Sequence, residues 1–116
     1  MLHASIEILK MKGIKMFCEK IAEICYLAAQ QNSNDYNVFV EMSGHISEIR
    51  VRVYYGGWDS NKDEINLGFS YYGDLRDHFY DEAFLTQIKL NMIKAHRLYR
   101  KHGIKFNPFE KFNERL

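Results

Sequence analysis

The chain has 116 residues, of which 47% are hydrophobic, and this length suits one domain around a single core. Sixteen Lys and Arg residues oppose fifteen Asp and Glu residues, so the formal charge of +1 creates no global field for a polyanion or an anionic membrane. No apolar run approaches the ~20 residues of a membrane span, and the N-terminus lacks a signal-peptide core, so a cytoplasmic protein without membrane contact is expected.

The first long element is predicted to be a helix. From Ile14 onward, apolar residues recur at three- and four-residue steps with charged residues between them, which predicts an amphipathic helix that ends near Gln31. Cys18 and Cys25 are the only cysteines and fall on this stripe. In a helix their Cα atoms would be about 10 Å apart, too far for a disulfide. We expect reduced, buried thiols.

Residues 1–13 have two interpretations that the sequence leaves open. Met11 is an internal methionine, so these residues can be an extension upstream of a core that starts later. Alternatively they form a first helical turn whose apolar residues are Leu2, Ile6 and Leu9.

Next, after a turn at residues 32–35, the apolar period changes from helical to alternating. Three half-buried strands are predicted over 38–42, 49–55 and 65–71. The turn at 43–45 is short and the loop at 56–63 is longer, so the strands should form an antiparallel meander in sequence order. Its inward side is predicted to be Val38, Val40, Val51, Val53, Leu67 and Phe69.

A second helix is predicted from Asp74, an N-cap after Gly73, to Gly103, with a break near 81–83. The tail, residues 104–116, should fold back, because exposed phenylalanines are a liability. The predicted buried stripe of this helix is Leu75, Phe79, Leu85, Ile88, Met92, Ala95 and Tyr99, and the apolar tail residues are Phe106, Phe109 and Phe112.

These elements define a fold class. Residues 1–116 are predicted to form a single α+β domain with two layers, in the order helix, three-stranded antiparallel meander, helix, with the C-terminal tail packed back. If both helices cover one face of the sheet, the other face stays open to solvent or a partner.

The open face is the candidate binding site. Aromatic rings and guanidinium groups are typical of protein interfaces and of single-strand nucleic-acid readers. The alternative is an ordinary solvated sheet on which Glu41 and Glu48 pair with the arginines. The residues predicted to project from this face are Phe39, Arg50, Arg52, Tyr54 and Tyr72, and Trp58 is predicted at the tip of the 56–63 loop.

Enzymatic and metal sites are not predicted. The chain has no nucleophile elbow, phosphate-binding glycine loop or dinucleotide fingerprint. Asp74, His78 and Glu82 share a helix face, but acidic residues in a first helical turn need no metal. Residues 59–63 begin like a calcium loop, yet Glu64 stands where that loop needs glycine. No catalytic residue, cofactor or metal is therefore expected.

The order of elements is also that of double-stranded-RNA-binding domains. Those domains hold phosphates at the start of the second helix, where this chain carries Asp74, Asp77, Asp81 and Glu82. These carboxylates would repel the RNA backbone, so this interpretation is rejected.

The segments 37–45 (NVFVEMSGH) and 49–59 (IRVRVYYGGWD), about a fifth of the chain, resemble a hairpin of small uncharacterised phage and prophage proteins. Such proteins include inhibitors of host defence, notably anti-CRISPR proteins, which occupy a nuclease surface. The resemblance implies this function for the present chain. A near-neutral chain is no DNA mimic, so an inhibitor of this kind would plug a site, block assembly or lock a conformation.

Three hypotheses follow. The first is a non-enzymatic phage or mobile-element protein that binds and inhibits a host protein, such as a CRISPR–Cas effector, in the bacterial cytoplasm, with Trp58 as its anchor. The second is a single-stranded nucleic-acid module that uses Phe39, Tyr54, Tyr72 and the two arginines. The third is a homodimeric structural or accessory phage protein whose sheets pair face to face. Salt dependence separates the first two, because only phosphate contacts weaken steeply with ionic strength.

Overall fold

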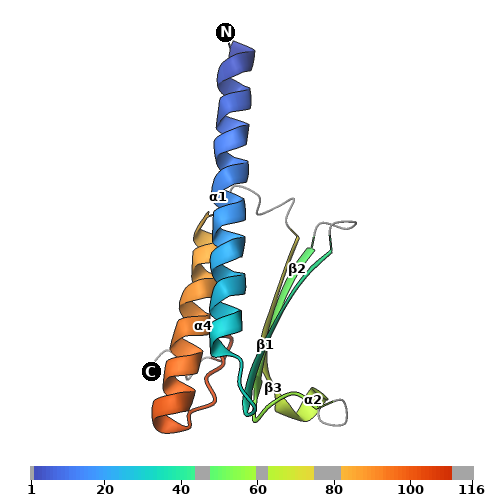
Figure 1. The fold of residues 1–116 in the computed structure, drawn as a ribbon, viewed down its shortest axis with the longest axis vertical. Helices are drawn as coiled ribbons and strands as arrows, with labels where there is room; N and C mark the ends of the chain where they lie inside the picture. The colour runs from blue at the N-terminus through green and yellow to red at the C-terminus, as the bar shows by residue number, and fades with distance from the viewer. Residues whose placement is uncertain (1, 44–47, 60–62, 75–81, 111–116) are drawn as a thin grey trace.

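The computed structural model describes residues 2–43, 48–59, 63–74 and 82–110. Figure 1 shows two layers, with two long helices on one face of a three-stranded sheet. The strands are antiparallel neighbours in the order β1-β2-β3. This confirms the predicted α+β fold. The elements are α1 Leu2–Gln31, β1 Tyr36–Ser43, β2 Glu48–Tyr55, α2 Asp63–Asn66, β3 Leu67–Asp74 and α4 Glu82–His102.

Helix α1 covers the predicted helix and begins earlier, at Leu2, passing Gly13 without a break. It stops where Asn32 satisfies the local backbone: the Asn32 carboxamide donates to the carbonyl of Ala28 at 2.7 Å and accepts from the amide of Val38 at 3.0 Å. One side chain therefore both ends α1 and ties it to the start of β1.

The two cysteines were predicted to be buried, and this prediction is wrong. Both thiols are free and exposed. The buried positions of α1 form a narrower stripe than the apolar pattern of the sequence predicts. Each cysteine comes one residue after a buried residue, so its side chain is rotated by about 100° away from the core. The buried residues of α1 are Phe17, Ile21, Ile24 and Ala28.

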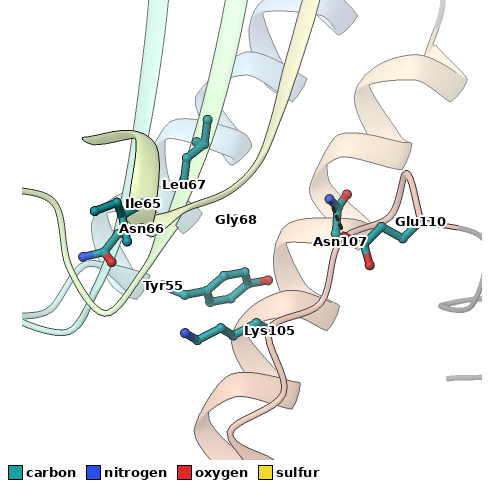
Figure 2. Close-up of a pocket in the computed structure, with 8 residues that line it drawn as sticks. All are labelled: Tyr55, Ile65, Asn66, Leu67, Gly68, Lys105, Asn107 and Glu110. Atoms are coloured by element: carbon teal, nitrogen blue, oxygen red, sulfur yellow. Dashed lines mark hydrogen bonds between the residues drawn. The ribbon is translucent and has the colours of Figure 1, made fainter. Parts of the chain in front are cut away.

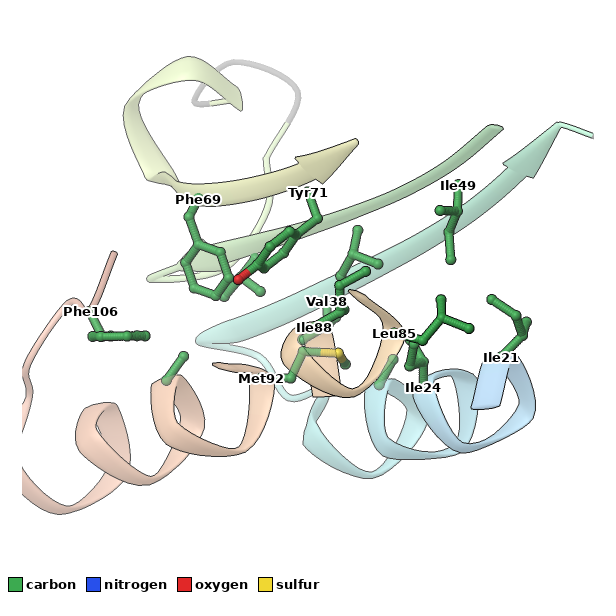
Figure 3. Packing of buried hydrophobic residues seen from close by; sticks show 14 of the residues in the cluster. Ile21, Ile24, Val38, Ile49, Phe69, Tyr71, Leu85, Ile88, Met92 and Phe106 are labelled. Atoms are coloured by element: carbon green, nitrogen blue, oxygen red, sulfur yellow. The ribbon is translucent and has the colours of Figure 1, made fainter. Parts of the chain in front are cut away.

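The inner face of the sheet meets the helices in one core (Figure 3). Val38 lies opposite Val53, and Val40 lies opposite Val51, as expected for strands with one buried face. The largest fully buried residues that the helices and the sheet contribute to this core include Ile24, Ile49, Val51, Val53, Leu85, Ile88 and Met92.

The third strand differs from its prediction at both ends. The short helix α2 occupies 63–66, so β3 begins at Leu67 rather than Ile65, and both of these side chains are exposed instead of contributing to the core. At the other end β3 continues through Gly73 to Asp74, so Gly73 does not break the strand as predicted. Whether Asp74 caps a helix depends on residues 75–81, which lie outside the described residues. A Cβ atom on Gly73 would lie 2.6 Å from the ring of Phe84, so this glycine allows α4 to pack closely on the strand.

Helix α4 buries Leu85, Ile88, Met92 and Ala95 as predicted, and Tyr99 is half-buried. Gly103 ends it with a φ of +65°, and its amide donates to the carbonyl of Tyr99 at 3.0 Å. This is the αL stop that the sequence predicts. The expectations that concern Leu75, Asp77, His78, Phe79, Asp81, Phe112, the turn at 44–45 and loop residues 60–62 lie outside the described residues.

The described part of the tail folds back through Phe106. Its ring is buried 6.3 Å from that of Phe69, and its carbonyl accepts a hydrogen bond from the Tyr55 hydroxyl. Phe109 contacts the edge of Tyr71 but stays largely exposed, so the tail prediction is confirmed for Phe106 and not for Phe109. Neither α1 nor α4, as far as the chain is described, combines the length and apolar character that crossing a bilayer requires.

Candidate protein-binding face

The face of the sheet turned away from α1 and α4, called here the outer face, is defined by the strand register. Phe39 pairs with Arg52, which pairs with Ser70, and Glu41 pairs with Arg50, which pairs with Tyr72. Because side chains alternate across a strand, these two rows point to the same side. In Figure 1 neither long helix lies on this side, where only the short helix α2 stands near one end.

One end of the outer face is an aromatic corner formed by Phe39, Tyr54 and Trp58. The ring of Phe39 meets Tyr54 edge to face at 5.5 Å and Trp58 at 5.8 Å. Tyr54 is only 1% exposed, whereas Trp58 is 47% exposed. The prediction that Tyr54 is open for contact is therefore wrong. A register irregularity between Val53 and Tyr54 breaks the alternation here, which lets successive residues of β2 all be buried.

Trp58 is positioned by the backbone of the two glycines before it and by the side chain of Asn37. Gly56 and Gly57 take φ values of +92° and +88°, which favour glycine. The carboxamide oxygen of Asn37 accepts the Trp58 amide at 2.6 Å, and the carboxamide of Asn66 donates to the Gly57 carbonyl at 2.8 Å. The indole is therefore pre-set against Phe39 with about half of its surface in solvent.

Arg52 serves the sheet itself rather than a partner. Its guanidinium forms an ion pair with Glu41, donates to the Tyr54 hydroxyl at 3.0 Å, and lies 5.5 Å from the centre of the Phe39 ring. Phe39 lies directly opposite Arg52, and Glu41 is two positions further along β1 on the same face, so this is a diagonal cross-strand pair. For Arg52, the interpretation as an ordinary solvated sheet is the one that the geometry supports.

Arg50 and Tyr72 are more available. Both are exposed, and the Arg50 guanidinium lies 5.6 Å above the Tyr72 ring, whose hydroxyl donates to Glu48. Among the described residues Arg50 forms no ion pair. A shallow hollow of about 170 Å³ separates Arg50 from the exposed Met42, with the two glutamates on its walls. This end of the outer face is mixed in charge and accessible.

Four of the six predicted residues thus form an accessible surface on the outer face: Phe39 in part, and Arg50, Trp58 and Tyr72. The other two are not available for contact: Tyr54 is buried, and Arg52 lies on the outer face but is paired with Glu41. Met42 was not among the predicted residues, because the alternating pattern assigns it to the buried side of the sheet. It is exposed because it lies near the end of the edge strand β1.

A second hollow, also about 170 Å³, lies between the start of β3 and the tail (Figure 2). Gly68 and Tyr55 lie side by side in its lining. The ring of Tyr55 occupies the space that a Cβ atom at position 68 would need, so only glycine fits there. Its remaining lining mixes apolar, carboxamide and charged groups, and on its tail side the Asn107 carboxamide donates to Glu110. No sequence motif marks this hollow. Its lining residues are Tyr55, Ile65, Asn66, Leu67, Gly68, Lys105, Asn107 and Glu110.

Buried polar groups beneath the sheet are poor candidates for catalysis. Burial raises the pKa of the Tyr36 and Tyr55 hydroxyls far above the usual value, which keeps both protonated and weakly nucleophilic. Burial, with the nearby Arg100 guanidinium, lowers the pKa of His96, which packs edge-on against Tyr36 at 4.9 Å. Across the described ranges, no three His, Cys, Asp or Glu residues gather as a metal site would require.

Comparison with known proteins returned no matching family model, no matching curated protein and no matching solved structure. The function must therefore be argued from the outer face.

Proposed function

We propose that this chain is a non-enzymatic binding protein whose outer face engages another protein, with Trp58 as the main anchor. The observation that supports this most strongly is the half-exposed indole of Trp58, held against Phe39 on a sheet face that neither long helix covers. Tryptophan is among the residues that most often dominate the energy of a protein interface.

The contacts that already hold Trp58 favour binding. Because the Asn37 side chain holds the Trp58 amide and the indole already packs against Phe39, less entropy is lost when a partner covers it. A tryptophan side chain buries about 150–250 Å² in all, so the 47% still exposed leaves roughly 100 Å². At about 25 cal/mol/Å², covering that area contributes about 2.5 kcal/mol.

The surroundings of Trp58 fit a protein partner. Arg50, Tyr72 and Met42 are exposed on or beside the same face, and arginine, tyrosine and methionine are enriched in interfaces. The resemblance of the hairpin to phage proteins makes a bacterial host protein, such as a CRISPR–Cas effector, the partner class to test first. In that setting the chain would act in the host cytoplasm by covering a functional surface of its target.

Single-stranded nucleic acid remains the alternative prediction, and the geometry favours it less. Of its proposed stacking and phosphate-binding residues, Tyr54 is buried and Arg52 is paired with Glu41. That leaves Phe39, Tyr72 and Arg50, a small platform with two glutamates beside it.

The test is affinity capture from a bacterial lysate, quantified by mass spectrometry. Wild-type bait is compared with Trp58→Ala and with Gln87→Ala, an exposed position on α4 far from the outer face. A partner of the outer face is lost with the first variant and kept with the second. Capture that survives Trp58→Ala refutes the anchor, and capture of nucleic acid that weakens steeply with salt supports the alternative.

A further inference from the structure

The free edge of β1 fixes the direction of the hydrogen bonds in the sheet. The carboxamide of Asn32 accepts from the Val38 amide at 3.0 Å and donates to the Val38 carbonyl at 3.1 Å, so both backbone groups of Val38 point away from β2. In an antiparallel pair the two directions alternate along each strand. Phe39 and Arg52 therefore exchange hydrogen bonds between β1 and β2, and the preceding residue of β2, Val51, directs its backbone groups toward β3.

The same alternation identifies the backbone groups that β3 leaves open. Val51 of β2 pairs with Tyr71 of β3, so Tyr71 uses its amide and carbonyl within the sheet. The neighbouring residues Ser70 and Tyr72 therefore direct theirs to the free edge of β3, which is the last strand in the sheet order. Within the described ranges, no hydrogen bond from another segment reaches these four groups.

The edge of β3 lacks the charges and prolines that keep sheet edges apart. Residues 67–73 (LGFSYYG) contain neither a charged residue nor a proline. The opposite edge of the sheet differs, because there the alternation leaves Val40 and Met42 open. Two copies of β1 paired through these residues would place their Glu41 carboxylates directly opposite each other, which is destabilising. The β3 edge is therefore the one that is free to pair.

Apolar side chains gather in solvent at the β3 edge. Leu67 and Tyr72, both on β3, are 40% and 56% exposed. Phe109 of the tail is 61% exposed, and the centre of its ring lies 5.1 Å from that of Tyr71, the residue between the two open positions. Single exposed apolar residues are common, but a group beside open backbone groups indicates a surface that another chain covers.

We infer that a second copy of this chain pairs with this edge, β3 against β3 in antiparallel order, so that two sheets become one sheet of six strands. The open groups set the register. Ser70 pairs with the partner's Tyr72, and Tyr72 pairs with the partner's Ser70, which gives four main-chain hydrogen bonds. The two-fold axis then passes between the two copies of Tyr71. Position 74, the only charged position of β3, faces the partner's Gly68, so no like charges lie opposite each other.

A second copy fits this edge better than an unrelated strand because the symmetry brings the exposed rings together. Tyr71 lies at the axis on the buried face of the sheet, and Phe109 packs beside it, so the two copies of Phe109 meet under the junction. The two-fold axis is perpendicular to the sheet. The long helices of both copies therefore lie on one side, and the two outer faces join on the other side.

The contact is small. Positions 68–74 span about 20 Å, and a sheet about 10 Å thick gives a strand contact of about 200 Å² per copy. The exposed part of Phe109 adds about 100 Å². A total of about 600 Å² is typical of weak, reversible contacts. This dimer leaves Trp58 uncovered, so it is independent of the proposed function.

The test is sedimentation equilibrium of the full chain at concentrations up to about 1 mM. Wild type should approach twice 13.8 kDa and dissociate on dilution. Ser70→Pro should stay at 13.8 kDa, because proline removes an open donor at a position where its ring is tolerated. Phe109→Arg, which leaves the strand unchanged, should weaken the dimer at least about tenfold, because two like charges would meet near the axis.

Two control variants separate this dimer from other arrangements. Met42→Pro is the matched change at the open edge of β1 and should still dimerise. Trp58→Ala, which alters the outer face, should also still dimerise. Far-UV circular dichroism confirms that each variant is folded.

Amide hydrogen exchange adds a readout at the level of single residues. In dilute wild type the amides of Ser70 and Tyr72 should exchange quickly, whereas the Tyr71 amide should exchange slowly because it is bonded within the sheet. At high concentration the first two amides should become protected as well.

Three results would overturn the inference. One is a wild-type chain that stays monomeric up to about 1 mM. Another is a dimer that persists in both Ser70→Pro and Phe109→Arg, particularly if Met42→Pro or Trp58→Ala dissociates it, because that dimer would use the β1 edge or the outer face. The third is exchange of the Ser70 and Tyr72 amides that does not change with concentration.

Discussion

The contrast between Tyr54 and Trp58 gives the sharpest stability prediction. Both rings belong to the aromatic corner, but Tyr54 is 1% exposed and Trp58 is 47% exposed. Truncation of a fully buried aromatic residue costs about 3–5 kcal/mol. Tyr54→Ala should therefore destabilise the fold by that amount. Trp58→Ala should cost about half as much, because roughly half of the indole is in solvent in the native state.

The corresponding shifts in Tm follow from the size of the chain. An unfolding entropy of about 2.1 cal/mol/K per residue gives about 0.24 kcal/mol/K for 116 residues. Tyr54→Ala should lower Tm by about 12–20 °C, and Trp58→Ala by about 6–10 °C. Tyr54→Phe is the matched control, since it removes only the hydroxyl that accepts from Arg52 and should cost about 0.5–1.5 kcal/mol.

Thermal unfolding followed by far-UV circular dichroism measures all three variants without relying on indole fluorescence. If Trp58→Ala melts as low as Tyr54→Ala, the indole belongs to the core, and its role as a binding anchor is refuted. If Tyr54→Ala melts close to wild type, the burial of Tyr54 and the irregular register of β2 beside it are refuted.

Three further predictions address other parts of the molecule. Gly57→Ala should destabilise the fold by about 1–3 kcal/mol in chemical denaturation, because a Cβ atom would lie 2.5 Å from the Asn34 carbonyl in a backbone with φ of +88°. Both Cys18 and Cys25 should react rapidly with a thiol reagent in the native state, and slow reaction would contradict their exposure. Burial lowers the pKa of His96 below its ordinary 6.5, so the unfolded state binds a proton at this imidazole more readily than the native state does. The free energy of unfolding should therefore fall as the pH drops below 6.5, and a His96→Gln variant should show a weaker fall.

The elements of the fold could be predicted because the sheet has only one buried face. Val38, Val51 and Val53 alternate with polar residues, so their periodicity reports directly on burial. Likewise the stop at Gly103 is a local property of the backbone. Such features need no knowledge of distant parts of the chain.

The features that sequence missed depend on distant contacts. Leu67 alternates like a core residue, but α2 and the irregular pairing beside Tyr54 shift the start of β3 and leave Leu67 in solvent. Cys18 and Cys25 satisfy a helical apolar pattern, yet the space left by the sheet and α4 admits a narrower stripe. Apolar pattern alone does not show which of two adjacent stripes faces a partner element.

For the candidate site, the sequence predicted which side chains lie on the outer face but not how they pair with one another. Alternation correctly assigned Phe39, Arg50 and Tyr72 to the outer face. It could not show that Arg52 is held by Glu41, because a diagonal pair competes with the direct one and the choice depends on the aromatic corner around it.

The outer face as a protein-binding surface is the central claim, and a single comparison tests it most directly. A partner captured by the wild-type chain is purified, and its affinity for wild type, Trp58→Ala and Gln87→Ala is measured by calorimetry. Loss of the roughly 100 Å² anchor predicts an affinity about 50- to 100-fold weaker for Trp58→Ala, with Gln87→Ala unchanged. Equal affinity for all three proteins would contradict the claim.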